Sequence, residues 1–126
     1  MGKGFEDLDI YQRSLAMGDS IYNLVSRWDW FAKDTVGKQI VRAADSVAAN
    51  ISEGFGRYHY NDRIRFIYFS RGSLYETQTW LIKAKQRKLI SNDEYEKIDS
   101  ELRLIGIKLN NFIQSLYKLS ATNNNK

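Results

Sequence analysis

The chain has 126 residues, of which 43% are hydrophobic and 27% are charged, and its formal net charge is +4. These values are ordinary for one soluble globular domain, and no apolar run approaches the roughly 20 residues that a membrane span requires. The absence of cysteine excludes disulfides, thiolate metal sites and cysteine nucleophiles, and the absence of proline favours long helices over a loop-rich β fold. The N-terminus lacks a signal-peptide pattern, so we expect a cytoplasmic protein with no membrane partner.

The first predicted helix covers about residues 7–27. Its apolar residues form two adjoining stripes at helical spacing: Leu8, Tyr11, Leu15, Tyr22 and Val25 in one, and Ile10, Met17, Ile21, Leu24 and Trp28 in the other. The two stripes together are wider than the face that one bundle core can bury. Leftover apolar surface on a soluble protein predicts an interface between copies of the chain. The alternative interpretation is that the wide face belongs to a broad core within one copy.

Three large aromatic residues, Trp28, Trp30 and Phe31, lie in the connection to the second predicted helix. Because large aromatic side chains mostly serve burial, we interpret them as a hydrophobic plug on the end of a bundle. The alternative interpretation is a platform on which nucleic-acid bases stack.

The second predicted helix covers about residues 35–55 and begins near Asp34 or Gly37, either of which is an acceptable N-cap. Its apolar stripe consists of Ile40, Ala44, Val47 and Ile51. We expect Gly54 and Gly56 to end the helix, since glycine tolerates the left-handed conformation of a C-terminal cap.

A line of polar residues runs along the neighbouring face of the second helix: Arg42, Ser46, Asn50 and Glu53. Beside an alanine-rich seam, such a line indicates a packed interface with internal hydrogen bonds rather than a solvated face. The third predicted helix, about residues 61–87, carries Ser73 and Glu76 on one face, and we expect both to complete this polar network. We predict that Glu76 pairs with Arg42, because a buried charge without a partner is costly.

The fourth predicted helix covers about residues 91–119 and has the clearest start signal in the chain. Ser91 and Glu94 form an S-x-x-E capping box. Seven apolar residues then alternate at spacings of three and four: Ile98, Leu102, Ile105, Leu109, Phe112, Leu116 and Leu119. The turn before this helix, around Lys88, has no glycine to cap the third helix. After the fourth helix, we expect residues 120–126 to form a flexible tail.

Four helices of this length with short connections predict an all-α fold, an up-down-up-down antiparallel four-helix bundle in which residues 1–126 form a single domain. His59 is the only histidine, whereas a ferritin-like di-iron site needs histidines on two helices. No nucleophile motif accompanies His59 either. We therefore expect no enzymatic activity, no catalytic or metal-binding residues and no cofactor.

The run Q-I-V-R-A-A-D-S-V-A-A-N-I-S-E-G over residues 39–54 and G-S-L-Y-E over residues 72–76 carry a family resemblance. They resemble the four helix bundle protein family, also called S23 or 23S ribosomal RNA intervening-sequence proteins, and the resemblance extends from Phe5 to about Leu119. That family is related to the accessory variability determinant of diversity-generating retroelements, which implies a homopentameric ring of bundles. The resemblance also implies partners: RNA or DNA, and a reverse transcriptase or another protein.

Basic residues are concentrated in the third helix and its flanks: Arg57, Arg63, Arg65, Arg71, Lys83, Lys85, Arg87 and Lys88. Against two acids, Asp62 and Glu76, these eight residues give the segment a charge of +6. A localised basic excess favours binding of nucleic acid through its phosphates, with little reading of bases. Each cation is also compatible with an ordinary solvated side chain, and the alternative function is a protein–protein scaffold that binds no nucleic acid.

Overall fold

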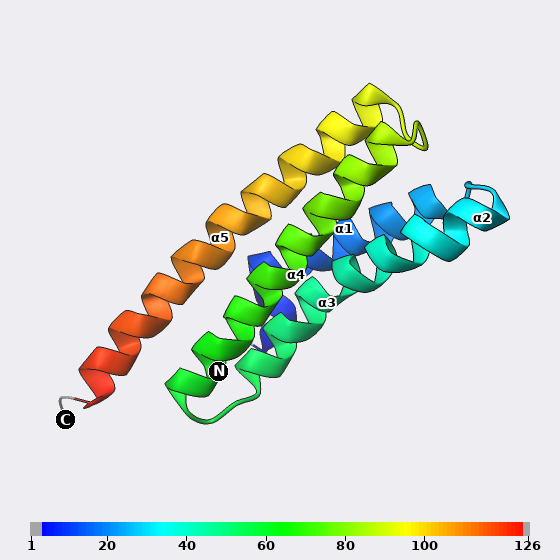
Figure 1. Cartoon of the computed structure of the whole chain (residues 1–126). Coiled ribbons are helices and arrows are strands. Elements are labelled where there is room, and N and C mark those ends of the chain that lie inside the picture. The colour runs from blue at the N-terminus through cyan, green and yellow to red at the C-terminus, as the bar shows by residue number, and fades with distance from the viewer. Residues whose placement is uncertain (1–3, 125–126) are drawn as a thin grey trace.

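The computed structural model describes residues 4–124, and in this part of the chain every regular element is a helix. Four long helices dominate: α1 (Asp9–Val25), α3 (Lys38–Phe55), α4 (Tyr60–Gln86) and α5 (Asn92–Asn124). Successive long helices run in opposite directions (Figure 1). Because α3 packs against α1 and α4, and α5 packs against α4 and α1, the four helices enclose one core. The predicted all-α four-helix bundle is confirmed.

Three short helical turns complete the described chain: the 3-10 turn η1 (Phe5–Asp7), the helical turn α2 (Trp30–Ala32) and the π turn η2 (Lys33–Gly37). The predicted helix start near Asp34 or Gly37 is wrong. The carboxylate of Asp29 accepts a hydrogen bond of 3.0 Å from the backbone N–H of Ala32, so helical backbone begins at Trp30. From there α2, η2 and α3 continue without a break, because each junction residue has right-handed helical angles.

Aliphatic side chains from all four long helices fill the core. Fully buried examples are Ile21, Ile40, Val47, Ile51, Ile67, Leu74, Leu81, Leu102, Ile105 and Leu109. Burial of each such side chain contributes roughly 1.5–3 kcal/mol relative to its exposure. This aliphatic core is therefore the main source of the stability of the bundle.

Three polar side chains are buried among the described residues: Ser14, Ser70 and Thr77. The hydroxyls of Ser14 and Thr77 donate to the carbonyl four residues earlier in their own helices. Ser70 Oγ donates instead to the carbonyl oxygen of Val47 at 2.7 Å and so joins α4 to α3. All three bonds offset the cost of burying a hydroxyl, and the one from Ser70 also favours a single register of α4 on α3.

The two glycines at the end of α3 do not form the predicted left-handed cap. No glycine in residues 4–124 has a positive φ, and the cap residue Gly56 has φ −77° and ψ −6°. Gly54 is buried within α3, where an added Cβ would lie 3.1 Å from both the carbonyl oxygen of Arg63 and the Cβ of Phe66. Gly54 therefore allows α4 to approach α3 closely rather than ending the helix.

The turn between α4 and α5 contains a residue in an unfavourable conformation. Lys88 has φ +60°, in the left-handed region. The N–H of Leu89 bonds to the carbonyl of Ala84 at 2.9 Å, and the N–H of Lys88 bonds to the carbonyl of Lys85 at 3.0 Å. This pair of bonds is the Schellman arrangement, in which glycine is the usual left-handed residue. A lysine there costs roughly 1–2 kcal/mol relative to glycine.

The predicted capping box at the start of α5 is confirmed. The N–H of Ser91 donates to Glu94 Oε1 at 2.9 Å, and the N–H of Glu94 donates to Ser91 Oγ at 3.1 Å. Arg27, just after α1, also pairs with Glu94 at 2.9 Å. The hydrogen bond from the Ser91 backbone, followed by the contact with Arg27, lowers the pKa of Glu94 below its ordinary value of 4.5.

The last helix is longer than predicted. It continues through Asn124, although the sequence analysis ended it at about residue 119 and expected a flexible tail over 120–126, of which residues 125–126 lie outside the described part. No glycine or proline follows Gly106, so the sequence contains no residue that would stop the helix. Leu119, named in the predicted seam, is 50% exposed, and Ile113 is buried whereas the predicted Phe112 is only partly buried.

We predict that Lys88→Gly stabilises the protein by about 1 kcal/mol, because glycine adopts the left-handed conformation without a Cβ clash. Lys88→Asn should give part of this gain, and Lys88→Ala, which removes the charge but keeps the Cβ, should give none. Urea unfolding of the three variants measures the difference. An equal gain in Lys88→Ala would show that charge, not backbone conformation, is responsible.

We also predict that Glu94→Gln destabilises the protein at neutral pH and has little effect in acid. Glutamine can keep the capping hydrogen bond, so the variant tests the charge. Because folding lowers the pKa of Glu94, the stability that its charge contributes is full above pH 4.5 and is lost as the pH falls through the folded-state pKa. Thermal unfolding against pH measures this, with the exposed Glu96→Gln as control; a deficit that persists in acid would refute the prediction.

Candidate nucleic-acid interface

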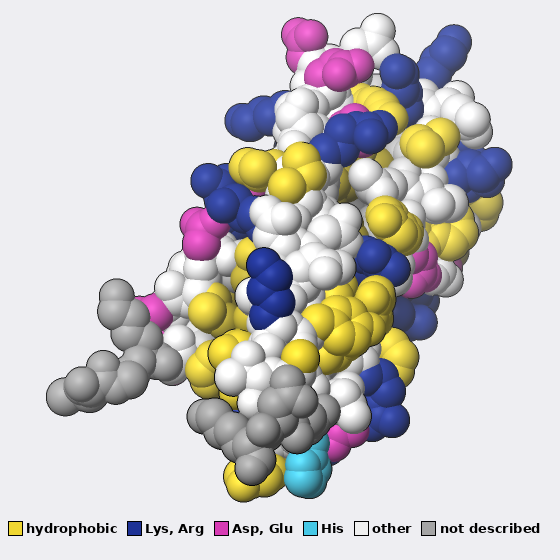
Figure 2. Space-filling model, turned by 90° about the vertical axis from the view of Figure 1, so that its left-hand side faces the viewer, with side chains coloured by type: hydrophobic (Ala, Val, Ile, Leu, Met, Phe, Trp, Pro, Cys, Tyr) yellow, Lys and Arg dark blue, Asp and Glu magenta, His cyan; other side chains and the backbone are white. Residues whose placement is uncertain are grey.

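The eight basic residues identified in the sequence do not form one surface. Three lie at the N-terminal end of α4 or in the turn before it, four lie at its C-terminal end, and Arg71 lies between them. Since α4 has 27 residues, its ends are roughly 40 Å apart. Figure 2 shows Lys and Arg side chains spread over one face of the molecule from end to end, with hydrophobic side chains between them.

The basic group at the N-terminal end of α4 is largely engaged in contacts of its own. Arg57 forms an ion pair with Glu53, and Arg65 pairs with Asp62 at 3.4 Å. Arg63 Nε donates to the carbonyl oxygen of Arg57 at 2.6 Å. These contacts compensate part of the positive charge at this end.

Arg71 holds α4 against α5. Its guanidinium carbon lies 4.7 Å from the centroid of the Tyr68 ring, and its Nη1 donates to Asn110 Oδ1 at 3.1 Å. The hydroxyl of Tyr68 in turn lies 3.5 Å from that of Tyr117. This pattern is that of a packing residue between two helices, and it leaves Arg71 less available to a phosphate.

The basic group at the C-terminal end of α4 consists of Lys83, Lys85, Arg87 and Lys88, all exposed. Within residues 4–124 none of the four forms a salt bridge, although the ammonium of Lys85 lies 4.3 Å from the centroid of the Tyr95 ring. Cations at a helix C-terminus also favourably oppose the helix dipole. This group is the larger uncompensated basic surface on α4.

Two of the three connection aromatics are exposed, so the predicted hydrophobic plug is wrong for them. Trp30 is 74% exposed and Phe31 is 69% exposed, whereas Trp28 is half-buried against the core. The cap formed by Asp29 starts a helical turn in which Ala32, not the aromatic residues, occupies the buried position. Figure 1 shows α2 at the same end of the bundle as the turn between α4 and α5, so the exposed pair and the C-terminal basic group share this end.

The predicted polar network on α3 consists of local contacts. Ser46 Oγ donates to the carbonyl of Arg42 at 2.9 Å, and Asn50 Nδ2 donates to the carbonyl of Ser46 at 2.9 Å. Glu53 pairs with Arg57 one turn further along the chain. The polar residues of α3 therefore satisfy one another along their own helix.

On α4 the network has a similar local character. Ser73 accepts through its carbonyl from Thr77, and Glu76 accepts a long hydrogen bond of 3.5 Å from Trp80 Nε1. In the described chain no salt bridge joins Arg42 to Glu76, so the predicted pair is not formed within a single copy. Both side chains are exposed, so neither charge needs a buried partner.

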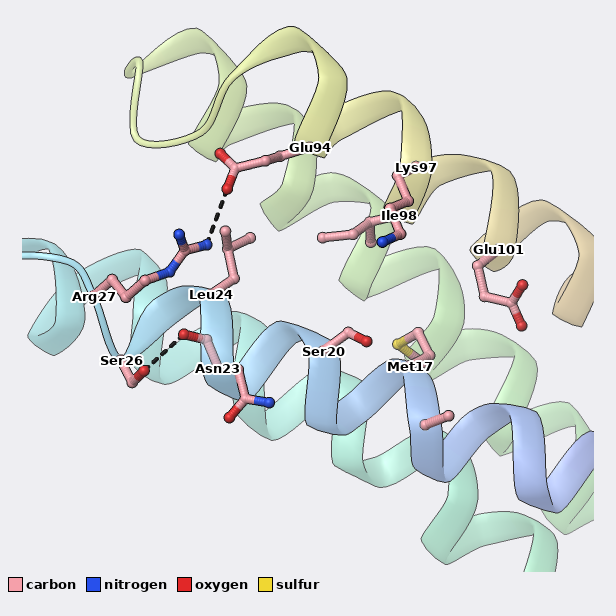
Figure 3. Close-up of a pocket in the computed structure, with 11 residues that line it drawn as sticks. Met17, Ser20, Asn23, Leu24, Ser26, Arg27, Glu94, Lys97, Ile98 and Glu101 are labelled. Atoms are coloured by element: carbon pink, nitrogen blue, oxygen red, sulfur yellow. Dashed lines mark hydrogen bonds and ion pairs between the residues drawn. The ribbon is translucent and has the colours of Figure 1, made fainter.

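A groove of about 660 Å³ lies between α1 and the start of α5 (Figure 3). Its apolar lining includes Met17, Leu24 and Ile98. Arg27 and Glu94, which line opposite walls, pair at 2.9 Å, and Glu101 in the lining pairs with Arg13, outside it, at 3.3 Å. Because these charges compensate one another, the groove is poorly suited to a polyanion.

A second groove, of about 390 Å³, lies between α1 and the segment formed by η2 and α3. Lys33, Lys38 and Arg42 line it together with Tyr22. The sequence analysis assigned Arg42 to the polar network and overlooked the two lysines. Lys33 and Lys38 are five residues apart, the hydrogen-bond spacing of a π turn, so a search at the α-helical period misses them.

His59, the single histidine, is exposed before α4 and packs its ring edge-on against Tyr58, with 5.0 Å between the ring centroids. Within the described residues, no group of three or more His, Cys, Asp or Glu side chains is placed to hold a metal ion.

None of the helices in residues 4–124 has the length and apolar character needed to cross a membrane.

Comparison with solved structures finds a similar fold in a protein of unknown function from the S23 ribosomal protein family of Bacteroides thetaiotaomicron, determined at 1.70 Å resolution. The TM-score is 0.75 at 26% sequence identity, over 82% of this chain and 97% of that chain. No functionally curated protein matches the chain. A family model described as 23S rRNA-intervening sequence protein matches residues 6–111. The chain therefore belongs to the 23S rRNA-intervening sequence protein family.

Proposed function

We propose that this protein is a non-enzymatic nucleic-acid-binding protein whose interface is the end of the bundle formed by α2 and the C-terminus of α4. The observation that carries this proposal is the exposure of Trp30 and Phe31 at the same end as a group of cations without acidic partners in the described chain. The family description, 23S rRNA-intervening sequence protein, supports RNA as the first ligand to test.

Each part of this interface fits one part of a single strand. The charged ends of Lys83, Arg87 and Lys88 suit backbone phosphates, which give affinity that weakens with salt. The faces of Trp30 and Phe31 suit unpaired bases, because stacking on an aromatic ring accepts any base. The interface therefore favours single-stranded over duplex nucleic acid and reads little sequence.

We predict that a single-stranded RNA binds more tightly than the matching duplex, measured by fluorescence anisotropy over a range of salt concentrations. Replacing Lys83, Arg87 and Lys88 together by Gln should reduce the slope of log affinity against log salt by about 0.7 for each phosphate that the variant no longer neutralises. Trp30→Ala and Phe31→Ala should each cost about 1–3 kcal/mol for a stacked base and leave the salt slope unchanged.

The matched control is the triple Gln variant of Arg57, Arg63 and Arg65, at the other end of α4. It removes the same formal charge, so the proposal expects it to keep most of the affinity. Equal losses of affinity in the two triple variants would contradict the proposed interface. They would mean that the nucleic acid binds elsewhere or that affinity depends only on the net charge of the protein. No binding of either probe at low salt would reject the function and favour a protein scaffold.

Self-assembly is a second candidate function, supported by an aromatic pair on α4. The rings of Phe66 and Phe69 pack edge to face with centroids 5.4 Å apart, and Phe69 is 50% exposed. On α3, which packs against α4, the side chains of Ser46 and Asn50 already donate to the backbone of their own helix. A second copy can therefore cover this face without leaving those donors unpaired. The homopentameric ring implied by the family resemblance is the assembly to test.

We predict that the wild-type protein is an oligomer in light scattering coupled to size-exclusion chromatography, and that Phe69→Ser shifts it toward monomer. The control is Tyr58→Ser, which removes an aromatic ring that is 87% exposed in the turn before α4 and should leave the mass unchanged. A monomeric wild-type protein at every concentration tested would contradict this candidate.

A further inference from the structure

The groove between α1 and the η2–α3 segment has three basic residues in its lining. Lys33, Lys38 and Arg42 contribute to its lining, and no acidic residue does. Its volume of about 390 Å³ lies within the usual range for small-ligand sites. A site with this lining suits a compact anion.

The local backbone explains how three cations come to share this groove. Lys33 begins the π turn η2 and Lys38 follows it. Because a π turn is wider than an α-helical turn, residues five apart lie on the same side of the helix there. Gly37 is buried beneath them, and an added Cβ there would lie 2.7 Å from Val25 Cγ1. The close approach of α1 to the π turn, which requires the absence of a side chain at Gly37, forms the base of the groove.

The charge of the groove is mostly uncompensated. Neither Lys33 nor Arg42 forms a salt bridge within residues 4–124. Lys38 pairs with Asp34 at 3.2 Å, but both side chains are about half exposed, and such a pair one helical turn apart is weak. Asp34 therefore competes only weakly with an incoming anion for Lys38.

We propose that this groove binds a terminal phosphate monoester of a nucleic-acid strand. A phosphate monoester carries a charge of roughly −1.5 to −2 at neutral pH, whereas an internal phosphodiester carries about −1. Three cations around one small groove thus favour a strand end over the middle of a strand. This inference rests on the proposed function. The phosphate in the groove would be the end of the same single strand that the proposed interface at α2 and the C-terminus of α4 binds.

The surroundings of the groove fit the nucleotide that follows the phosphate. Tyr22 lines the groove and is 61% exposed, so its ring is available to stack on the adjoining base. Lys33 directly follows α2, which carries Trp30 and Phe31. The chain therefore places the phosphate site and the stacking residues next to each other.

The test compares three forms of one short oligouridylate with an internal fluorescent label: 5′-phosphorylated, 3′-phosphorylated and with hydroxyls at both ends. The wild-type protein should bind at least one phosphorylated form about tenfold or more tightly than the hydroxyl form, as expected for charge-assisted hydrogen bonds to the phosphate. The form that is favoured identifies which end enters the groove. The double variant Lys33→Gln and Arg42→Gln should lose this preference and bind all three forms like the hydroxyl strand.

The matched control is the double variant Lys83→Gln and Arg87→Gln, which should weaken all three forms alike and retain the preference. Thermal unfolding verifies that both double variants are folded, which the exposure of all four residues favours. Equal binding of the three forms by the wild-type protein overturns the inference and leaves the proposed function standing. Loss of the preference in both double variants also overturns it, and no binding of any form overturns inference and function together.

Discussion

The close contact between α3 and α4 is the constraint on which the rest of this structure depends. It combines a line of buried aliphatic side chains, a glycine that brings the helices together at Gly54 and a buried hydrogen bond from Ser70 to the backbone of Val47. A buried hydroxyl without its acceptor costs more than the bond itself contributes, so other registers of α4 on α3 are disfavoured. The connection that carries the exposed aromatic residues lies at the same end of the bundle as the C-terminus of α4 (Figure 1).

The length of α4 determines how the charge of this protein acts. Apart from Arg71, the basic residues of α4 and its flanks lie in two groups roughly 40 Å apart, several times the screening length of about 8–10 Å in physiological salt. The two groups therefore act independently on a ligand. The group near Arg57 is partly compensated by Glu53 and Asp62, whereas the group near Arg87 has no acidic partner in the described chain. The net charge of +4 for the whole chain does not show this difference between the two groups.

The connection between α1 and α3 shows how one capping residue can change the character of a surface. The carboxylate of Asp29 starts a helical turn one residue before Trp30, so Trp30 and Phe31 face solvent while Ala32 is buried. The π turn that follows brings Lys33 and Lys38 to one groove. A segment that reads as a hydrophobic plug is thus a surface with exposed rings and positive charge, the combination that suits a nucleic-acid strand.

The sequence by itself determined the four amphipathic helices, their antiparallel order and the capping box of Ser91 and Glu94, because helical periodicity and caps depend on residues within a few positions of one another. It also determined which residue types are absent, cysteine and proline among them. Only the tertiary structure decided which aromatic rings are buried, which cations lie together and why Gly54 is a glycine. Those properties depend on the distance between helices and on their register, and neither quantity is encoded in the spacing of residues along one helix.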